Sequence, residues 1–294
     1  MFSIIICSIS PERLKSLTAN ISSTIGVQHE IIAIDNREKK WPIAKAYNYG
    51  AAQAKYPYLF FVHEDVKFHS IAWGSFVQRK LQEPNCGVVG FAGGKVMLKS
   101  YSGWNQYWEW VCCYLYQDDN GVARFDVSNA YLEHPFEEVV TLDGLGMFVR
   151  KELWKQHPFD ETLLTGFHCY HIDFSLQIIC GGRYKNYVCC SNQVLIEHFS
   201  KGAYNKEWYA DTIRLYKCKW SKILPVKVYN YQLTDKEIQK HTERLAYDFL
   251  KQIFRSNVIR TNKWLVLIEF WKRPLSWKHL RRCISYTFRY WINN

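Results

Sequence analysis

Apolar runs alternate with helical patterns along the first third of the chain. Near-continuous apolar stretches at 2–6, 30–34 and 58–62 predict buried strands. Leucines and isoleucines recur at helical spacing over 14–25, and the small-residue stretch 44–54 is typical of a second helix. Strands that alternate with helices favour a parallel sheet with right-handed crossovers.

Further strand patterns follow in the middle of the chain. The runs 87–94, 139–142, 145–149 and 194–198 are short and apolar. The glycines of the first run indicate a place where the backbone closely approaches a ligand or another strand. A helix is expected from Asp173 to Ile179.

The stretch 95–138 has no clear period. Its aromatic-rich part, 101–116, could be a binding surface, since long irregular loops often bind ligands. It could equally be a hairpin that buries its rings. The sequence leaves the two interpretations open.

The pattern changes after Pro225. Thr234 and Glu237 have the spacing of a capping box, and apolar residues then recur on one helical face. We therefore divide the chain into an α/β domain over 1–228 and a helical, basic and aromatic extension over 229–294.

Composition narrows the class of protein. With 294 residues, 48% hydrophobic and 17% aromatic, the chain can bury a sizeable core and is not a disordered protein. Met1 is followed at once by a strand-like run, which is not the pattern of a signal peptide. No apolar stretch reaches the length of about 18 residues that spans a membrane. We expect a cytoplasmic protein.

Ten cysteines occur, and several lie in or beside apolar runs. No C-x-x-C pair is present, and adjacent pairs such as Cys112-Cys113 suit zinc poorly. Reduced core thiols are the favoured interpretation.

The net charge of +11 comes from the end of the chain, where residues 251–294 carry ten Lys/Arg and one acid, Glu269. Interleaved aromatics make this segment suited to an anionic membrane surface. The alternative is a helical appendage that packs its aromatics on the α/β domain. Nucleic-acid binding is disfavoured, because the basicity is absent from the α/β part and no nucleic-acid module is recognised.

His63-Glu64-Asp65 ends the buried run 58–62. Polar groups at the carboxyl end of such a strand point into the crevice where open α/β sheets bind ligands. Carboxylates there suit Mg²⁺ or Mn²⁺. The alternative is that Asp65 caps the next helix.

Together these segments resemble the GT-A glycosyltransferases of family 2, in particular the glycosyltransferase-2-like branch of bacterial polysaccharide and antibiotic-sugar clusters. The resemblance covers roughly residues 1–225. It implies a GT-A, Rossmann-like fold with a mixed, mostly parallel sheet flanked by helices. It rests on the segments 3–8 with 30–36, 46–51, 61–66, 142–144, 166–177 and 197–202.

The resemblance implies a nucleotide-diphosphate-sugar donor and a sugar or lipid-linked sugar as the acceptor. Cys7, Ser8 and Asp35 match the positions that hold the nucleotide, although Asp35-Asn36 could be only a turn pair. Asp143 matches a position that faces one of the sugars, with a turn aspartate as the alternative. The residues placed at the donor by this comparison are Cys7, Ser8, Asp35, Asn36, Asn48, His63, Glu64 and Asp143.

His63-Glu64-Asp65 occupies the place of the family's D-x-D motif. Asp65 matches the carboxylate that coordinates the divalent metal, Mn²⁺ or Mg²⁺, and His198 matches a late histidine that completes the metal shell. His63 replaces the usual first aspartate, which puts a direct contact there in doubt.

The catalytic base is where the chain departs from the family. The expected acidic pair is Tyr170-His171 here. His171 could accept the proton of the acceptor hydroxyl, Asp173 is the second possibility, and altered or lost activity is the third. The function implied is metal-dependent, inverting sugar transfer in bacterial surface polysaccharide or glycoconjugate synthesis, peripheral to the membrane; the alternative is a non-catalytic nucleotide-sugar-binding pseudoenzyme.

Overall fold

A computed structural model describes residues 1–118, 121–127, 134–200, 202, 204–272 and 276–292. Lys201 of the 197–202 segment, and parts of the stretch 95–138 and of the C-terminal extension, lie outside the described residues. The strands discussed below are β1 (Phe2–Ser8), β2 (His29–Asp35), β3 (Tyr58–Val62), β4 (Val66–Phe68), β5 (Cys86–Gly90), β6 (Ala92–Gly94), β7 (Val96–Met97), β8 (Val111–Asp118), β9 (Ala123–Val127), β10 (Phe136–Val139), β11 (Thr141–Leu142), β12 (Gly146–Arg150), β13 (Lys185–Cys189), β14 (Ile196–His198) and β15 (Val226–Lys227). The α-helices are α1 (Pro11–Thr24), α2 (Ile43–Gln53), α3 (Trp73–Leu81), α4 (Lys151–Gln156), α5 (Tyr170–Ile179), α6 (Lys206–Leu215), α7 (Asp235–Arg255), α8 (Arg260–Trp271) and α9 (Trp277–Ile292).

The main sheet has the order β10-β13-β5-β12-β3-β1-β2 among the described strands. β1 pairs in parallel with both β2 and β3, and β13 pairs in parallel with β5. β12 lies between β3 and β5 and is antiparallel to both, and β10 is antiparallel to β13. The sheet is therefore mixed and mostly parallel, as the sequence predicts.

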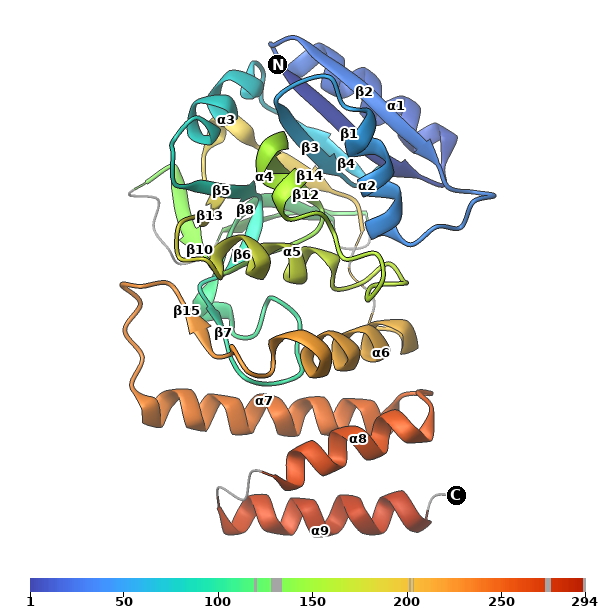
Figure 1. The fold of residues 1–294 in the computed structure, drawn as a ribbon, viewed down its shortest axis with the longest axis vertical. Coiled ribbons are helices and arrows are strands. Elements are labelled where there is room, and N and C mark those ends of the chain that lie inside the picture. The colour runs from blue at the N-terminus through green and yellow to red at the C-terminus, as the bar shows by residue number, and fades with distance from the viewer. Residues whose placement is uncertain (119–120, 128–133, 201, 203, 273–275, 293–294) are drawn as a thin grey trace.

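Helices cover the two faces of this sheet (Figure 1). Side chains that alternate along a strand divide between the faces: Phe60 joins a cluster with residues of α1 and α3, whereas Phe61 joins a cluster with residues of α2 and α5. Both phenylalanines are fully buried. This explains why β1 and β3 read as continuous apolar runs.

A second sheet has the strand order β11-β6-β8-β14-β4 and lies next to the candidate site. Its strand β14 returns late in the chain and lies between β4 and β8, antiparallel to β4 and parallel to β8. A Cβ atom added at Gly93 of β6 would lie 2.4 Å from the Thr141 carbonyl oxygen. The predicted close backbone approach in 87–94 is thus to another strand.

The aromatic stretch 101–116 includes a strand of a hairpin. β8 pairs antiparallel with β9, and the Trp110 and Tyr114 rings are buried while Trp108 is 54% exposed. The hairpin interpretation is therefore confirmed for 111–116 only, because Trp104, Tyr107, Trp108 and Trp110 lie before β8, and of these four only Trp110 is fully buried.

Two local expectations are wrong. Asp65 does not cap a helix, because it lies in the turn between β3 and β4. The helix expected from Asp173 begins at Tyr170, because Cys169 with a φ of 64° acts as its N-cap residue. Asp173 consequently lies inside the first turn rather than before it.

The C-terminal helices α7, α8 and α9 stack at one end of the long axis, with the N-terminal strands toward the other end (Figure 1). The capping box predicted at Thr234 and Glu237 is present at the start of α7. Phe249 of α7 contacts the rings of Tyr101 and Tyr209, so these helices share a core with the α/β part. Among the described helices, none is long and apolar enough to cross a bilayer. The cysteines are free thiols, and most of them are buried.

Candidate functional site

The carboxyl ends of β1, β2 and β3 meet at one edge of the main sheet. Ser8 at the end of β1 is in register with Asp35 at the end of β2. His63 follows directly after β3, and its N–H donates to the Leu145 carbonyl (3.0 Å). Parallel pairing therefore brings Ser8, Asp35 and His63 to one edge.

His63, Asp65 and His198 form a compact group at this edge. One potential ligand atom from each lies within 4.8 Å of those of the other two, and Asp65 Oδ1 is 3.7 Å from His198 Nε2. β14 positions His198, because its pairing with β4 sets His198 opposite Val66 and lets the Phe199 N–H donate to the Asp65 carbonyl (3.0 Å). The structure thus brings together Asp65 and His198, as the sequence predicts, and adds His63.

Gln117 of β8 fixes the tautomer of His198. The Gln117 Nε2 group donates to the carbonyls of His198 (3.1 Å) and Ser200 (2.8 Å), so its Oε1 is the acceptor for His198 Nδ1–H (3.2 Å). With the proton on Nδ1, the lone pair of His198 is on Nε2, the nitrogen near Asp65. A ligating histidine is commonly oriented in this way by a hydrogen bond to its other nitrogen.

Tyr170 does the same for His63. The Tyr170 hydroxyl donates to the Gly144 carbonyl (2.8 Å), so it accepts from His63 Nε2–H (2.8 Å). This leaves the lone pair of His63 on Nδ1. Burial lowers the pKa of His63, so the imidazole is neutral at pH 7 and able to act as a ligand.

Asp65 is nine-tenths buried and remains ionised. Burial raises the pKa of its carboxyl, but His198, Ser200 and His63 outweigh this effect and leave the pKa below its usual value. Two imidazoles and one carboxylate make a donor set that fits a divalent ion with mixed nitrogen and oxygen preference.

Glu64 holds the loop after β1. Its Oε2 accepts hydrogen bonds from the Ser8 hydroxyl (2.5 Å) and from the N–H groups of Ile9 and Ser10 (3.1 Å each). The structure therefore brings Ser8 and Glu64 into direct contact. Cys7 precedes Ser8 and is half-buried. Burial, together with the nearby Glu64 charge, raises the pKa of its thiol to about 11.

The Asp35-Asn36 pair forms a turn. The Asn36 side chain accepts from the Trp41 N–H (2.8 Å) and donates to the Trp41 carbonyl (3.0 Å), which closes the loop 36–41. The exposed Asp35 carboxylate is held by Arg37, whose hydrogen bonds lower the Asp35 pKa to about 2. The turn interpretation is confirmed for Asn36, whereas Asp35 lies at the end of β2, in register with Ser8, as a charged acceptor.

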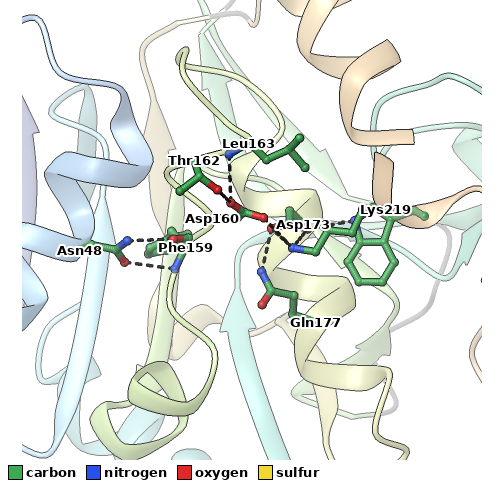
Figure 2. A network of polar contacts seen from close by, with 9 residues as sticks. Asn48, Phe159, Asp160, Thr162, Leu163, Asp173, Gln177 and Lys219 are labelled. Carbon is green, nitrogen blue, oxygen red and sulfur yellow. Dashed lines mark hydrogen bonds and ion pairs between the residues drawn. The ribbon is translucent and has the colours of Figure 1, made fainter. Parts of the chain in front are cut away.

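Asn48 has a packing role. Its Oδ1 accepts from the Phe159 N–H (3.1 Å) and its Nδ2 donates to the Phe159 carbonyl (2.8 Å) (Figure 2). Its Oδ1 also accepts from the Trp154 indole N–H (3.1 Å). These bonds attach α2 to the segment after α4. We therefore leave Asn48 out of the donor site.

The assignment of Asp173 as a possible base is corrected by its surroundings. Its carboxylate is 1% exposed and forms an ion pair with Lys219 (2.9 Å). It also accepts from the Gln177 amide (2.7 Å) and the Trp220 indole (3.0 Å) (Figure 2). Both oxygens are occupied inside the protein, so no acceptor hydroxyl can reach them.

His171 lies on the same turn of α5 but differs in its partners. Its Nδ1 is buried and, among the described residues, has no hydrogen-bond partner. A Cβ atom added at Gly144 would lie 3.0 Å from this nitrogen. Burial lowers the pKa of His171 to about 4, with Asp143 acting in the opposite direction. The neutral ring is in the protonation state that can accept a proton.

Asp143 forms a turn next to this histidine. Its Oδ1 accepts from the Leu145 N–H (2.8 Å), which confirms the turn-aspartate alternative. Its charge acts on His63 and His171, so it still faces the site.

Sequence reasoning missed three residues of the site, Gln117, Tyr170 in its bonding role, and Phe167. The Phe167 ring is 53% exposed and its centroid is 5.4 Å from that of His63. The position of Phe167 directly before the His168–His171 segment was the only available signal. Gln117 lies in the stretch without a readable period.

Comparisons with known proteins identify the family and the fold. A family model described as "Glycosyltransferase like family" matches residues 3–212. No curated protein sequence matches the chain. The structure of S. aureus TarS 1–349 in complex with UDP is similar with a TM-score of 0.51 and 14% identity, over 97% of this chain and 88% of that one.

GalNAc-T7 with UDP, GalNAc and Mn²⁺ is similar with a TM-score of 0.52 and 12% identity, over 76% of this chain. The chain spans about half of that protein, since the match covers 48% of it. These similarities show that the chain has the GT-A fold that its sequence predicts.

Proposed function

Because the chain belongs to the glycosyltransferase-like family whose model matches residues 3–212, we propose that it transfers a sugar from a nucleotide-diphosphate-sugar donor to a hydroxyl acceptor. The observation that carries the proposal is the group of His63, Asp65 and His198 at the edge where the parallel strands end. This is the edge at which open α/β sheets bind their ligands.

These three residues would hold a divalent cation. Their two imidazoles favour Mn²⁺ over Mg²⁺, because Mg²⁺ prefers oxygen ligands. When bound, such an ion offsets the negative charge that builds on the diphosphate leaving group. Gln117 and Tyr170 keep the two histidines in the tautomers that a cation requires.

The proposed base is His171. In one displacement, the acceptor oxygen forms a bond to the anomeric carbon, the bond from that carbon to the diphosphate breaks, and the acceptor proton passes to His171. Inversion of this kind needs one base and no covalent nucleophile. Neutral His171 fits the role, whereas Asp173 is enclosed by Lys219 and Trp220.

The donor would lie along Cys7, Ser8 and Asp35, with Glu64 fixing the loop after β1. The Asp35 carboxylate can accept from a ribose hydroxyl or the N–H of a base. UDP is the first nucleotide to test, since both similar structures named above contain it. Asp143 would face the transferred sugar.

We place the reaction in the synthesis of a bacterial surface polysaccharide or glycoconjugate, on a sugar or lipid-linked sugar acceptor. The protein would act in the cytoplasm, peripheral to the membrane. The basic, aromatic C-terminal helices support the membrane part of this setting.

A nucleotide-sugar-binding pseudoenzyme is the second candidate. The observation that favours it is the low pKa of about 4 at His171, which makes this residue a weak base.

Thermal unfolding with nucleoside diphosphates, each with and without Mn²⁺, tests the donor site, because a ligand that binds only the folded state raises the melting temperature. We expect a Mn²⁺-dependent rise with one diphosphate, and loss of that rise in Asp65→Ala. Glu152→Ala, an exposed acid on α4, is the matched control.

Release of the nucleoside diphosphate from sugar donors then separates the two candidates. Turnover that is lost in Asp65→Ala supports the transferase. A Mn²⁺-dependent thermal shift without turnover on any acceptor supports the pseudoenzyme. If no diphosphate changes the melting temperature, the donor site is wrong.

A further inference from the structure

Helix α9 has two different faces. His279, Cys283 and Tyr286 are buried against the helices above it. The His279 ring stacks on Phe270 of α8 at 4.0 Å, and its Nε2–H donates to the Phe270 carbonyl (2.8 Å). This inner face explains why α9 packs on α7 and α8. On the opposite face, among the described residues, Trp291 contacts Trp264 and Arg260 of α8 at one edge, and the other large apolar side chains are exposed.

The outer face carries five large apolar side chains, with Arg281 between the first and second of them. Trp277, Phe288, Trp291 and Ile292 are 83%, 62%, 63% and 72% exposed, and Ile284 between them is 44% exposed. Soluble proteins seldom expose so many apolar side chains on one helix face, and such patches mark interaction sites.

Cations lie on the same face. Lys278, Arg281 and Arg289 are exposed and line an open groove of about 590 Å³ together with Trp277. Within the described residues, none of these three forms an ion pair with an acid. α9 contains four Lys/Arg and no Asp or Glu.

Its fourth cation, Arg282, is used internally. The Arg282 guanidinium lies 3.6 Å from the Tyr247 ring centroid and 4.0 Å from Glu243. Glu243 of α7 therefore lies on the inner side of α9, and the outer face of α9 keeps its positive charge.

We propose that the outer face of α9 docks on an anionic membrane, with its aromatic and aliphatic side chains in the headgroup region and Lys278, Arg281 and Arg289 on acidic headgroups. A helix that lies in the interface combines these features: an apolar face with aromatics, and basic residues beside it. The outward Ile284 and Ile292 favour hydrocarbon over nucleobases, which stack on rings.

The position of α9 fits this role. It forms the end of the molecule's long axis, with no further element beyond it among the described residues (Figure 1). Binding to the membrane does not depend on the proposed sugar transfer. Only its use, holding the site near lipid-linked acceptors, rests on the proposed function.

Co-sedimentation of the full-length protein with vesicles tests the inference. The vesicles contain equal parts of phosphatidylglycerol and phosphatidylcholine, and pure phosphatidylcholine is the neutral comparison. We expect binding to the anionic vesicles that weakens with salt. Replacing Lys278, Arg281 and Arg289 by Gln should lower the partition coefficient on the order of a hundredfold, at about fivefold for each cation.

A second variant, Trp277→Ser with Phe288→Ser and Trp291→Ser, should lose binding to both kinds of vesicle. Matched controls replace exposed residues elsewhere: Ile71→Ser with Tyr229→Ser, and Arg13→Gln, Lys15→Gln and Lys55→Gln. All the substituted residues are at the surface, and circular dichroism checks that each variant folds.

Four results would overturn the inference. The first is that the wild type does not pellet with anionic vesicles, and the second is that the α9 variants pellet as the controls do. The third is that the wild type dimerises without lipid while the variant with Trp277→Ser is monomeric, which would assign the face to a second copy. The fourth is that a single-stranded oligonucleotide displaces the protein from the vesicles through the same residues, which would assign the face to nucleic acid.

Discussion

Gln117 Oε1 lies 3.2 Å from His198 Nδ1, and the two residues are in register on the paired strands β8 and β14. Because the Gln117 amide is oriented by two carbonyls, this contact determines which nitrogen of His198 can bind a cation. A residue outside the candidate metal group thereby controls its chemistry.

Gln117→Leu should weaken Mn²⁺ binding by about ten- to a hundredfold, the usual cost of losing a partner of a ligating histidine. The reason is that His198 can then adopt the wrong tautomer. Isothermal titration with Mn²⁺ measures the effect, and Gln53→Leu on the exposed side of α2 is the control. Equal affinities in the two variants would contradict the assignment.

Tyr170→Phe should destabilise the protein and weaken Mn²⁺ binding. It leaves the Gly144 carbonyl and His63 Nε2–H without their partner, and each such buried group costs about 1–3 kcal/mol. Urea unfolding and the same titration report the two effects. Tyr229→Phe, at an 87% exposed position, should change neither.

His171→Gln should affect activity, whereas Asp173→Asn should affect stability. The first should lower kcat by about a hundred- to ten-thousandfold, as loss of a general base does, with the melting temperature nearly unchanged. The second removes the Asp173 charge and leaves Lys219 paired with Asp160, so it should lower the free energy of unfolding, by at most about 3 kcal/mol because the lysine is 27% exposed.

Turnover and urea unfolding of both variants check this pair. If Asp173→Asn loses activity at full stability, the acid is a catalytic residue and our correction fails.

The low pKa of His171 also predicts how stability depends on pH. Between about 4, its pKa in the folded protein, and its usual value of 6.5, the unfolded chain binds a proton that the folded chain does not. The free energy of unfolding should therefore rise with pH through this window, by at most about 1.4 kcal/mol per pH unit from this group.

Urea unfolding across the window, in the wild type and in His171→Gln, isolates the contribution, because desolvation lowers the pKa of half-buried His63 and His168 in the same way in both proteins. Parallel pH profiles would show that His171 does not titrate as expected.

The sequence located the main sheet because its central strands are buried on both faces and therefore read as apolar runs. Polar residues that end these runs, such as Ser8 and His63, could be placed at one edge by the rule for parallel strands. His198 could not be placed in this way, since it reaches Asp65 through the pairing of β14 with β4, and only the family resemblance pointed to it.

Asp173 shows a different limit. Its helix starts earlier than the sequence indicates, because Cys169 adopts a positive φ at a position where no glycine announces a turn. Asp173 therefore lies within α5, where it pairs with Lys219. Gln117 was missed because its contacts with His198 and Ser200 depend on the pairing of β8 with β14, a segment far along the chain.

The return of β14 between β4 and β8 has a consequence for how the protein matures. His63 and Asp65 emerge early in synthesis, but their third partner, His198, joins them only after two thirds of the chain has been made and has folded back. An ion held by all three would therefore lock the first and last thirds of the α/β part together. A nascent or proteolytically nicked chain should fail to retain it, so ion retention would report completed assembly.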